Sequence, residues 1–175
     1  MVFNYSYQVQ FSDTDGAGVV YFAQFLTICH GAYEASLQAS GIELQHFFSG
    51  QWRPTVVAEE GNSKPTTIAL PALAIPIVET HSKFYQPCRC GDRLKIRLRA
   101  RELKDSEFEV NYEWLIGDGG DRPSRPAGTA KTRHVCLQIG DNQSRQRHPL
   151  PKALHHWLEF VASDDSAASP SNASS

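Results

Sequence analysis

The sequence lacks the features that mark secreted, membrane and nucleic-acid-binding proteins. Its 175 residues include only four cysteines, and the formal net charge is −2. So few cysteines do not form a disulfide framework, and without a secretory signal the thiols are expected to stay reduced. No apolar run approaches the roughly 20 residues that span a bilayer, and the charge gives no reason to expect nucleic acid or an anionic membrane as a partner. We expect a cytoplasmic protein with one core.

Motifs for several common kinds of catalysis are also missing. The chain has no G-x-S-x-G, G-x-x-x-x-G-K-[ST] or G-x-G-x-x-G segment, so serine-hydrolase, P-loop and dinucleotide interpretations lack their motifs. Cys88 and Cys90 form a C-x-C pair, but Cys29 and Cys136 lie at no zinc-ligand spacing from them. We expect neither a metal nor a cofactor.

Periodic patterns predict the first elements. Apolar residues alternate over residues 3–11, which predicts a half-buried strand. A three- and four-residue spacing over residues 21–40 predicts an amphipathic helix of about five turns, with Gly41 just beyond its end. Residues 61–74 are rich in Gly, Pro, Ser and Thr and are expected to form a loop insertion, followed by a strand over residues 77–85.

Two strands flank a predicted turn at residues 104–106, one strongly basic and the other acidic on one face. A hairpin register that pairs Arg101 with Glu109 also pairs Arg97 with Glu113. The basic stripe alone would suggest nucleic acid or coenzyme phosphates, but these carboxylates neutralise much of its field. Cross-strand pairing is therefore the favoured interpretation of the stripe.

The remaining segments complete an α+β class. Residues 117–128 predict a loop, residues 129–139 a last long strand, and residues 151–162 a short helix. Residues 163–175 have too few apolar side chains to bury and are expected to be a disordered tail, which leaves residues 1–162 as one domain. A single long helix covers only one face of an antiparallel sheet, and its open edges favour a homodimer with continuous or facing sheets.

Residues 11–22, between the first strand and the long helix, contain two aspartates and two glycines. Asp15 precedes a helix start whose N–H groups have no intrahelical partner, so an acid and an oxyanion site can be neighbours here. Asp13 or Asp15 can instead be an N-cap or Asx-turn acid. Gly16 and Gly18 favour a functional role, because they let a ligand approach the backbone closely.

The histidines give weaker signals. His30 and Glu34 are spaced i and i+4 on the predicted helix, which favours a surface pair. His81 and His134 lie on strand patterns, where a structural role is favoured over a general base.

Two segments carry a family resemblance. Residues 11–22 (FSDTDGAGVVYF) resemble the signature of hotdog-fold acyl-CoA thioesterases of the 4-hydroxybenzoyl-CoA thioesterase type. Residues 84–87 (FYQP) and 91–94 (GDRL) are similar to a second, weaker landmark of that family, and the resemblance covers roughly residues 3–140. It implies a hotdog fold, with an antiparallel sheet wrapped around one long central helix, and a homodimer or homotetramer that acts on an acyl-CoA.

The resemblance also implies roles for individual residues. Asp15 takes the place of the family's catalytic carboxylate, acting as a nucleophile or as a general base on water. The backbone N–H groups near the helix start are expected to receive the thioester oxygen. The expected substrate-binding residues are Gly18, Val19, Tyr21 and Phe22.

The acyl group is less well defined. Related short-chain thioesterases usually have histidine where this chain has Phe22, and an apolar ring favours an aromatic acyl group. The residues of the motif resemble those of the branch of the family that serves phylloquinone synthesis. A short- or medium-chain aliphatic acyl-CoA thioesterase and a non-catalytic acyl-CoA-binding dimer are the alternatives. Arg89, Arg93 and Lys131 are candidates for contacting the coenzyme phosphates.

Overall fold

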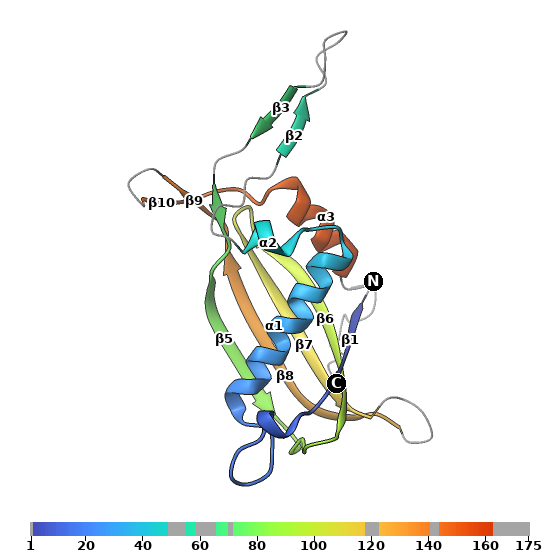
Figure 1. Ribbon diagram of the computed structural model, residues 1–175. Coiled ribbons are helices and arrows are strands. Elements are labelled where there is room, and N and C mark those ends of the chain that lie inside the picture. The colour runs from blue at the N-terminus through green and yellow to red at the C-terminus, as the bar shows by residue number, and fades with distance from the viewer. Residues whose placement is uncertain are drawn as a thin grey trace, which may run out of the picture.

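A computed structural model of the protein describes residues 2–48, 55–58, 66–69, 72–117, 123–140 and 144–162. Its main feature is a five-stranded antiparallel sheet with helix α1 (Phe22–Ala39) across one face (Figure 1). The antiparallel sheet and the few helices agree with the predicted α+β class. In spatial order the strands are β1 (Phe3–Gln8), β6 (Arg93–Lys104), β7 (Glu107–Ile116), β8 (Arg125–Val135) and β5 (Ile77–Phe84).

The predicted pairing of the basic and acidic strands is confirmed. In the register of β6 and β7, Arg97 lies opposite Glu113 and Arg101 lies opposite Glu109. The nearest guanidinium nitrogen of each arginine is 3.2 Å from a carboxylate oxygen of its partner. Lys131 on β8 adds a second cation to Glu109, at 2.9 Å. Neighbouring carboxylates thus offset much of the basic stripe.

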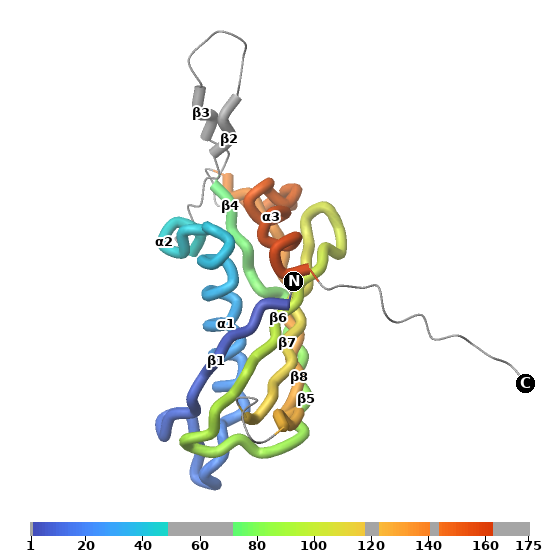
Figure 2. Tube along the Cα trace, turned by 90° about the vertical axis from the view of Figure 1, so that its right-hand side faces the viewer, coloured from blue at the N-terminus to red at the C-terminus, as the bar shows by residue number. Residues whose placement is uncertain are grey.

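Helix α1 forms because its apolar residues recur on one face, and that face is buried. Phe25, Cys29, Tyr33 and Leu37 follow one another at four-residue steps and belong to the core. The helix ends as predicted: Gly41 has φ +91°, and its N–H donates to the Gln38 carbonyl at 3.0 Å. Figure 2 shows α1 on one side of the sheet.

The predicted C-terminal helix is confirmed as α3 (Lys152–Val161). It packs at the end of the sheet near the C-terminus of α1 (Figures 1 and 2). Trp157 on α3 is fully buried, and its indole Nε1–H donates to Ser36 Oγ at 3.0 Å. This bond satisfies two polar groups in the core and joins α3 to α1.

Two predictions for the first 74 residues differ from the structure. β1 ends at Gln8 rather than at residue 11, because the 3-10 turn η1 (Phe11–Asp13) bends the chain there. Within residues 61–74, expected as a loop, lie β3 (Thr66–Ala69) and β4 (Leu73–Ala74). β3 pairs with β2 (Thr55–Ala58), and the other residues of 61–71 lie outside the described residues.

The C-terminal strands also differ from the prediction. The expected loop 117–128 is shorter, because β8 begins at Arg125. The expected strand 129–139 is divided at Cys136, whose N–H donates to the Ser106 carbonyl at 2.8 Å instead of continuing the ladder. After this break β9 (Leu137–Ile139) joins a separate sheet, between β4 and β10 (Arg145–Arg147).

The short helix α2 (Leu44–Phe47), which follows α1, had no clear signal in the sequence. Residues 163–175, expected to be a disordered tail, lie outside the described residues. None of the helices in the described part of the chain is long and apolar enough to cross a membrane.

Candidate active site at the start of α1

Asp15 opens a tight loop that the chain closes with its own hydrogen bonds. The Asp15 N–H donates to the Val19 carbonyl, and the Gly18 N–H donates to the Asp15 carbonyl, both at 2.9 Å. The Ala17 N–H donates to Asp15 Oδ1 at 2.8 Å, which makes an Asx turn. Gly18 has φ +73°, a conformation that side-chain-bearing residues rarely adopt. Asp15 is exposed, and within the described residues its Oδ2 accepts no hydrogen bond.

Asp13 has a different environment and a structural role. Its side chain is 7% exposed. Its Oδ2 accepts hydrogen bonds from the Tyr7 hydroxyl at 2.8 Å and from the Gln10 N–H at 2.7 Å. The carboxylate therefore ties β1 to the turn that precedes the Asp15 loop. Burial, followed by the hydrogen bond to Asp13, raises the pKa of Tyr7 to about 12.

The start of α1 has two backbone donors left over. The Tyr21 N–H donates to the Asp13 carbonyl at 2.8 Å, so this amide is already engaged. The Gln24 N–H donates to the Tyr21 carbonyl, also at 2.8 Å. Among the described residues no acceptor faces the N–H groups of Phe22 and Ala23, which occupy the first two helical positions. These two amides are the available anion donors.

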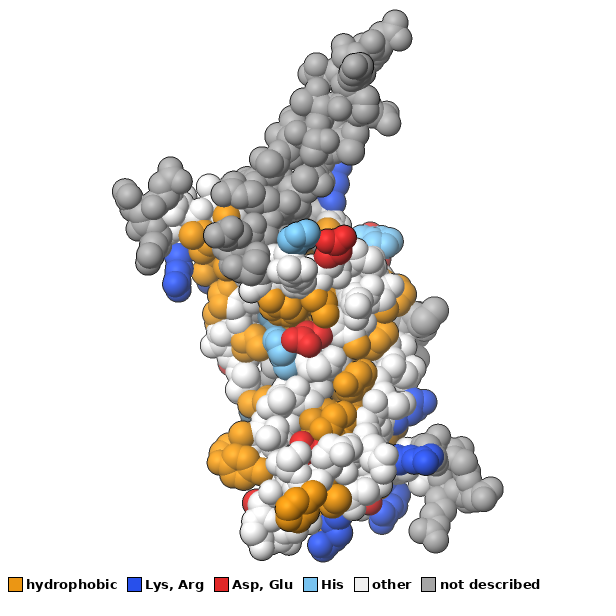
Figure 3. Space-filling model, in the orientation of Figure 1, with side chains coloured by type: hydrophobic (Ala, Val, Ile, Leu, Met, Phe, Trp, Pro, Cys, Tyr) orange, Lys and Arg blue, Asp and Glu red, His pale blue; other side chains and the backbone are white. Residues whose placement is uncertain are grey.

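A depression of about 380 Å³ adjoins Asp15 and the helix start. One side comes from the Asp15 loop and α1, and the other from residues 84–88. The Val20 N–H donates to the Cys88 carbonyl at 2.8 Å and joins these two sides. Figure 3 shows hydrophobic side chains at the end of the molecule where α1 begins. The lining residues are Asp15, Val19, Val20, Tyr21, Phe22, Phe25, Phe84, Tyr85, Gln86, Pro87 and Cys88.

Aromatic rings dominate this depression. Phe22 is 62% exposed and Tyr85 54% exposed, which is unusual for such large side chains. Beneath them the ring of Phe25 lies 4.7 Å from that of Phe84 and 4.4 Å from that of Trp114, measured between centroids. The surface therefore offers apolar, ring-shaped contacts beside a carboxylate.

Of the predicted substrate-binding residues, Val19, Tyr21 and Phe22 line the depression, whereas Gly18 shapes the loop. Their contact with a substrate stays a prediction. Tyr85 and Gln86 also line the depression and were not predicted as site residues. The FYQP landmark was their signal in the sequence, but nothing local showed that it would line the same depression as Asp15.

The three basic candidates for coenzyme contacts lie in different places. Lys131 is engaged by Glu109 on the sheet surface. Arg93 lines a polar groove beside β1, on the strand that follows the 89–92 turn. Arg89 is exposed directly after Cys88, and its backbone N–H donates to Asp92 Oδ2 at 2.7 Å. Of the three candidates, Arg89 is thus the one nearest in sequence to the depression.

The other ionisable groups have structural environments. His30 and Glu34 form the predicted pair on α1, at 3.2 Å. His134 is 1% exposed, and its Nε2 lies 2.9 Å from Thr132 Oγ1. Burial, and then the neighbouring His30, lowers the pKa of His134 to about 3, so its ring is neutral at physiological pH.

The thiol of Cys88, at the depression, is a weak candidate for a nucleophile. Burial, and then Asp92, raises its pKa to about 11, so the thiol stays protonated at neutral pH. His81, on edge strand β5, is exposed. The described ranges contain no group of three His, Cys, Asp or Glu side chains placed to hold a metal ion.

The arrangement is suited to attack on a carbonyl that carries a good leaving group. A carboxylate oxygen without a partner can take a proton from water or attack directly. Two free amides at a helix start can stabilise an oxyanion, and in other enzymes one such donor lowers the activation barrier by roughly 3 kcal/mol. Together with the apolar lining, these features are those of an acyl-transfer site.

Comparison with known proteins agrees with this chemistry. The chain belongs to the thioesterase-like superfamily, whose model matches residues 9–158. It is 41% identical to the 1,4-dihydroxy-2-naphthoyl-CoA hydrolase of Synechococcus elongatus over 161 residues. These residues are 91% of this chain and 98% of the relative. The hydrolase of the same name from Gloeothece citriformis is 42% identical over 159 residues, covering 90% and 92%. The solved 1,4-dihydroxy-2-naphthoyl-CoA thioesterase of Synechocystis superposes with a TM-score of 0.71 and 31% identity, covering 92% of this chain and 98% of that one.

Proposed function

We propose that this protein hydrolyses 1,4-dihydroxy-2-naphthoyl-CoA to 1,4-dihydroxy-2-naphthoate and coenzyme A, a step of phylloquinone synthesis. One observation carries the proposal: a carboxylate with a free oxygen, Asp15, adjoins two unpaired helix amides and an aromatic depression. The names of the similar hydrolases support the naphthoyl substrate.

In the proposed reaction the thioester carbonyl oxygen accepts hydrogen bonds from the amides of Phe22 and Ala23. Asp15 either takes a proton from an attacking water or attacks the carbonyl carbon itself to form an anhydride, which water then hydrolyses. In both routes the carbon–sulfur bond breaks and coenzyme A leaves as a thiolate, which takes up a proton. The naphthoyl rings lie against the exposed rings of Phe22 and Tyr85, where stacking adds to apolar burial.

Two other functions are compatible with the same depression. An aliphatic acyl-CoA thioesterase would use the same Asp15, and a non-catalytic dimer would bind acyl-CoA without turnover. The deciding measurement is kcat/KM for aryl-CoA and for short- and medium-chain acyl-CoA substrates. We expect the aromatic ester to be preferred by at least about tenfold, which corresponds to about 1.4 kcal/mol of transition-state binding. Equal or reversed values would contradict the naphthoyl assignment.

Asp15→Asn tests the catalytic role. The amide oxygen can still accept the Ala17 N–H, so the loop and the fold should be retained. We expect hydrolysis to fall by about 10²-fold or more, because an amide is a poor base and a poor nucleophile. The matched control is Asp105→Asn, an exposed aspartate in the turn between β6 and β7, outside the depression. Near-normal kcat in folded Asp15→Asn protein would rule out this mechanism.

We also propose that residues 1–162 form one hotdog domain in which α1 is the central helix. β5 ends the sheet order, and its side chains are largely exposed, so it is a suitable edge for pairing with a second copy. A homodimer or homotetramer with a continuous sheet would follow. Analytical ultracentrifugation tests this, and a monomer at micromolar concentration would refute it. The free cysteines support the cytoplasm as the compartment.

A further inference from the structure

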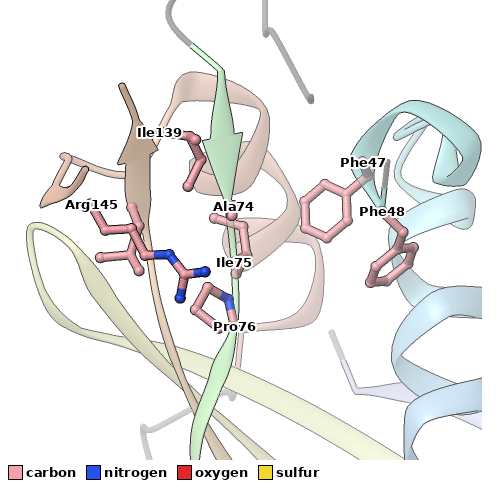
Figure 4. A pocket seen from close by; sticks show the side chains of 8 residues that line it. Phe47, Phe48, Ala74, Ile75, Pro76, Ile139 and Arg145 are labelled. Carbon is pink, nitrogen blue, oxygen red and sulfur yellow. The ribbon is translucent and has the colours of Figure 1, made fainter. Parts of the chain in front are cut away.

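A second chamber is lined by residues at α2, β4 and β9 (Figure 4). These elements lie at the other end of α1 from the Asp15 loop (Figure 1). Its volume is about 520 Å³, within the range of small-molecule sites. The side chains that define it are Phe47, Phe48, Ile75, Leu137, Ile139 and Arg145. Apart from the arginine, these are all apolar.

Two phenylalanine rings form one wall of this chamber. Phe47 is 3% exposed and is fixed in the core, whereas Phe48 is 43% exposed. Their rings meet edge to face, with centroids 4.9 Å apart and planes at 83°. Figure 4 shows them across a gap from Ala74, Ile75 and Pro76. A gap between rings and aliphatic groups suits a flat apolar ligand.

Arg145 supplies the only charge among the described lining residues. Its guanidinium is turned toward Pro76 (Figure 4). Within the described residues it makes no ion pair, whereas Arg147, two positions later on the same strand, is paired with Glu107. A guanidinium that has no ion pair among the described residues, at the rim of an apolar chamber, favours an anion, and its fork shape suits a carboxylate in particular.

We propose that this chamber binds an aromatic carboxylate, with the rings against Phe47 and Phe48 and the carboxylate on Arg145. The identity of the natural ligand rests on the proposed function, because the thioesterase reaction releases an acid of this class. Such a site would let the product act on the protein at a place other than the Asp15 depression.

The test uses 1-hydroxy-2-naphthoate as the probe and isothermal calorimetry on the full chain. We expect Arg145→Gln to weaken its binding by about tenfold or more, because a charge-assisted hydrogen bond is lost. Binding of uncharged 1-naphthol should be the same in wild type and in Arg145→Gln. Phe48→Ala should weaken both probes. Arg99→Gln is the matched control, since Arg99 lies opposite Asn111 on the sheet surface and lines no part of the chamber.

Several results would overturn the proposal. Undetectable naphthoate binding by wild type, or equal binding by folded Arg145→Gln protein, would remove the site. Changed sedimentation of Arg145→Gln and Phe48→Ala without naphthoate binding would show that a second copy covers the chamber. Because the assay reads binding, it does not depend on turnover. A preference for aliphatic acyl-CoA would therefore reject the proposed substrate and leave this result intact.

Discussion

The buried carboxylate of Asp13 offers the sharpest test of how the fold positions the candidate site. The Asp13 carboxylate accepts the Tyr7 hydroxyl at 2.8 Å and the Gln10 N–H at 2.7 Å, and the Asp13 carbonyl accepts the Tyr21 N–H. Removing the carboxylate by Asp13→Ala leaves the Tyr7 hydroxyl and the Gln10 N–H without their acceptor. Tyr7→Phe removes only the first of these bonds. The two variants therefore separate the two halves of the contact.

The magnitudes follow from the contacts. Hydrogen bonds to a charged group contribute about 1.5–3 kcal/mol each, and the half-buried setting of Tyr7 favours the lower value. We expect Tyr7→Phe to lower the free energy of unfolding by about 1.5 kcal/mol and Asp13→Ala by about 3 kcal/mol. The double variant should lose about 1.5 kcal/mol less than the sum, because both single changes break the same bond. Each kcal/mol corresponds to a fall in Tm of about 2–4 °C for a chain of this size.

Urea unfolding of the four proteins at one pH measures the coupling. A spectroscopic titration of Tyr7 provides a second readout, since its pKa of about 12 should fall in Asp13→Ala when the hydrogen bond is lost. Hydrolysis should fall about tenfold or more in Asp13→Ala and less in Tyr7→Phe, because only the first change releases the turn before Asp15. Additive free energies, within about 0.3 kcal/mol, would refute the reasoning.

Two further predictions concern stability and selectivity. The pKa of His134 is about 3 in the folded protein and about 6.5 in the unfolded chain, so between these pH values only the unfolded chain binds the proton. The stability that the neutral His134 confers is therefore complete above pH 6.5. Between pH 6.5 and 3 the free energy of unfolding falls by up to about 1.4 kcal/mol per pH unit. His134→Phe should flatten this acid-side slope in urea unfolding series, and the exposed His156→Gln should not; equal slopes would argue against the assignment. Phe22→Ala should lower kcat/KM for aryl-CoA by about tenfold and leave medium-chain acyl-CoA less affected, and equal losses would mean that Phe22 does not select the ring.

Much of the fold was accessible from periodicity alone. The helix over residues 21–40 and the register of Arg97 and Arg101 were predicted because each depends on side chains close together in the sequence. The division of the last strand at Cys136 was missed, because it depends on a bond to Ser106 in a distant turn. The strand β4 was missed for the same reason, since its partner β9 lies more than 60 residues away in the sequence.

The candidate site shows a similar division. The residues around Asp15 identified an acid, two glycines and a helix start, because turn chemistry is local. Only the tertiary structure decided that Asp13 takes the Tyr21 amide and so leaves Phe22 and Ala23 as donors. It also brought Tyr85 and Asp15 to the same depression and placed Arg145 and two phenylalanines around one chamber. These contacts join segments far apart in the chain, and packing of the whole core brings them together.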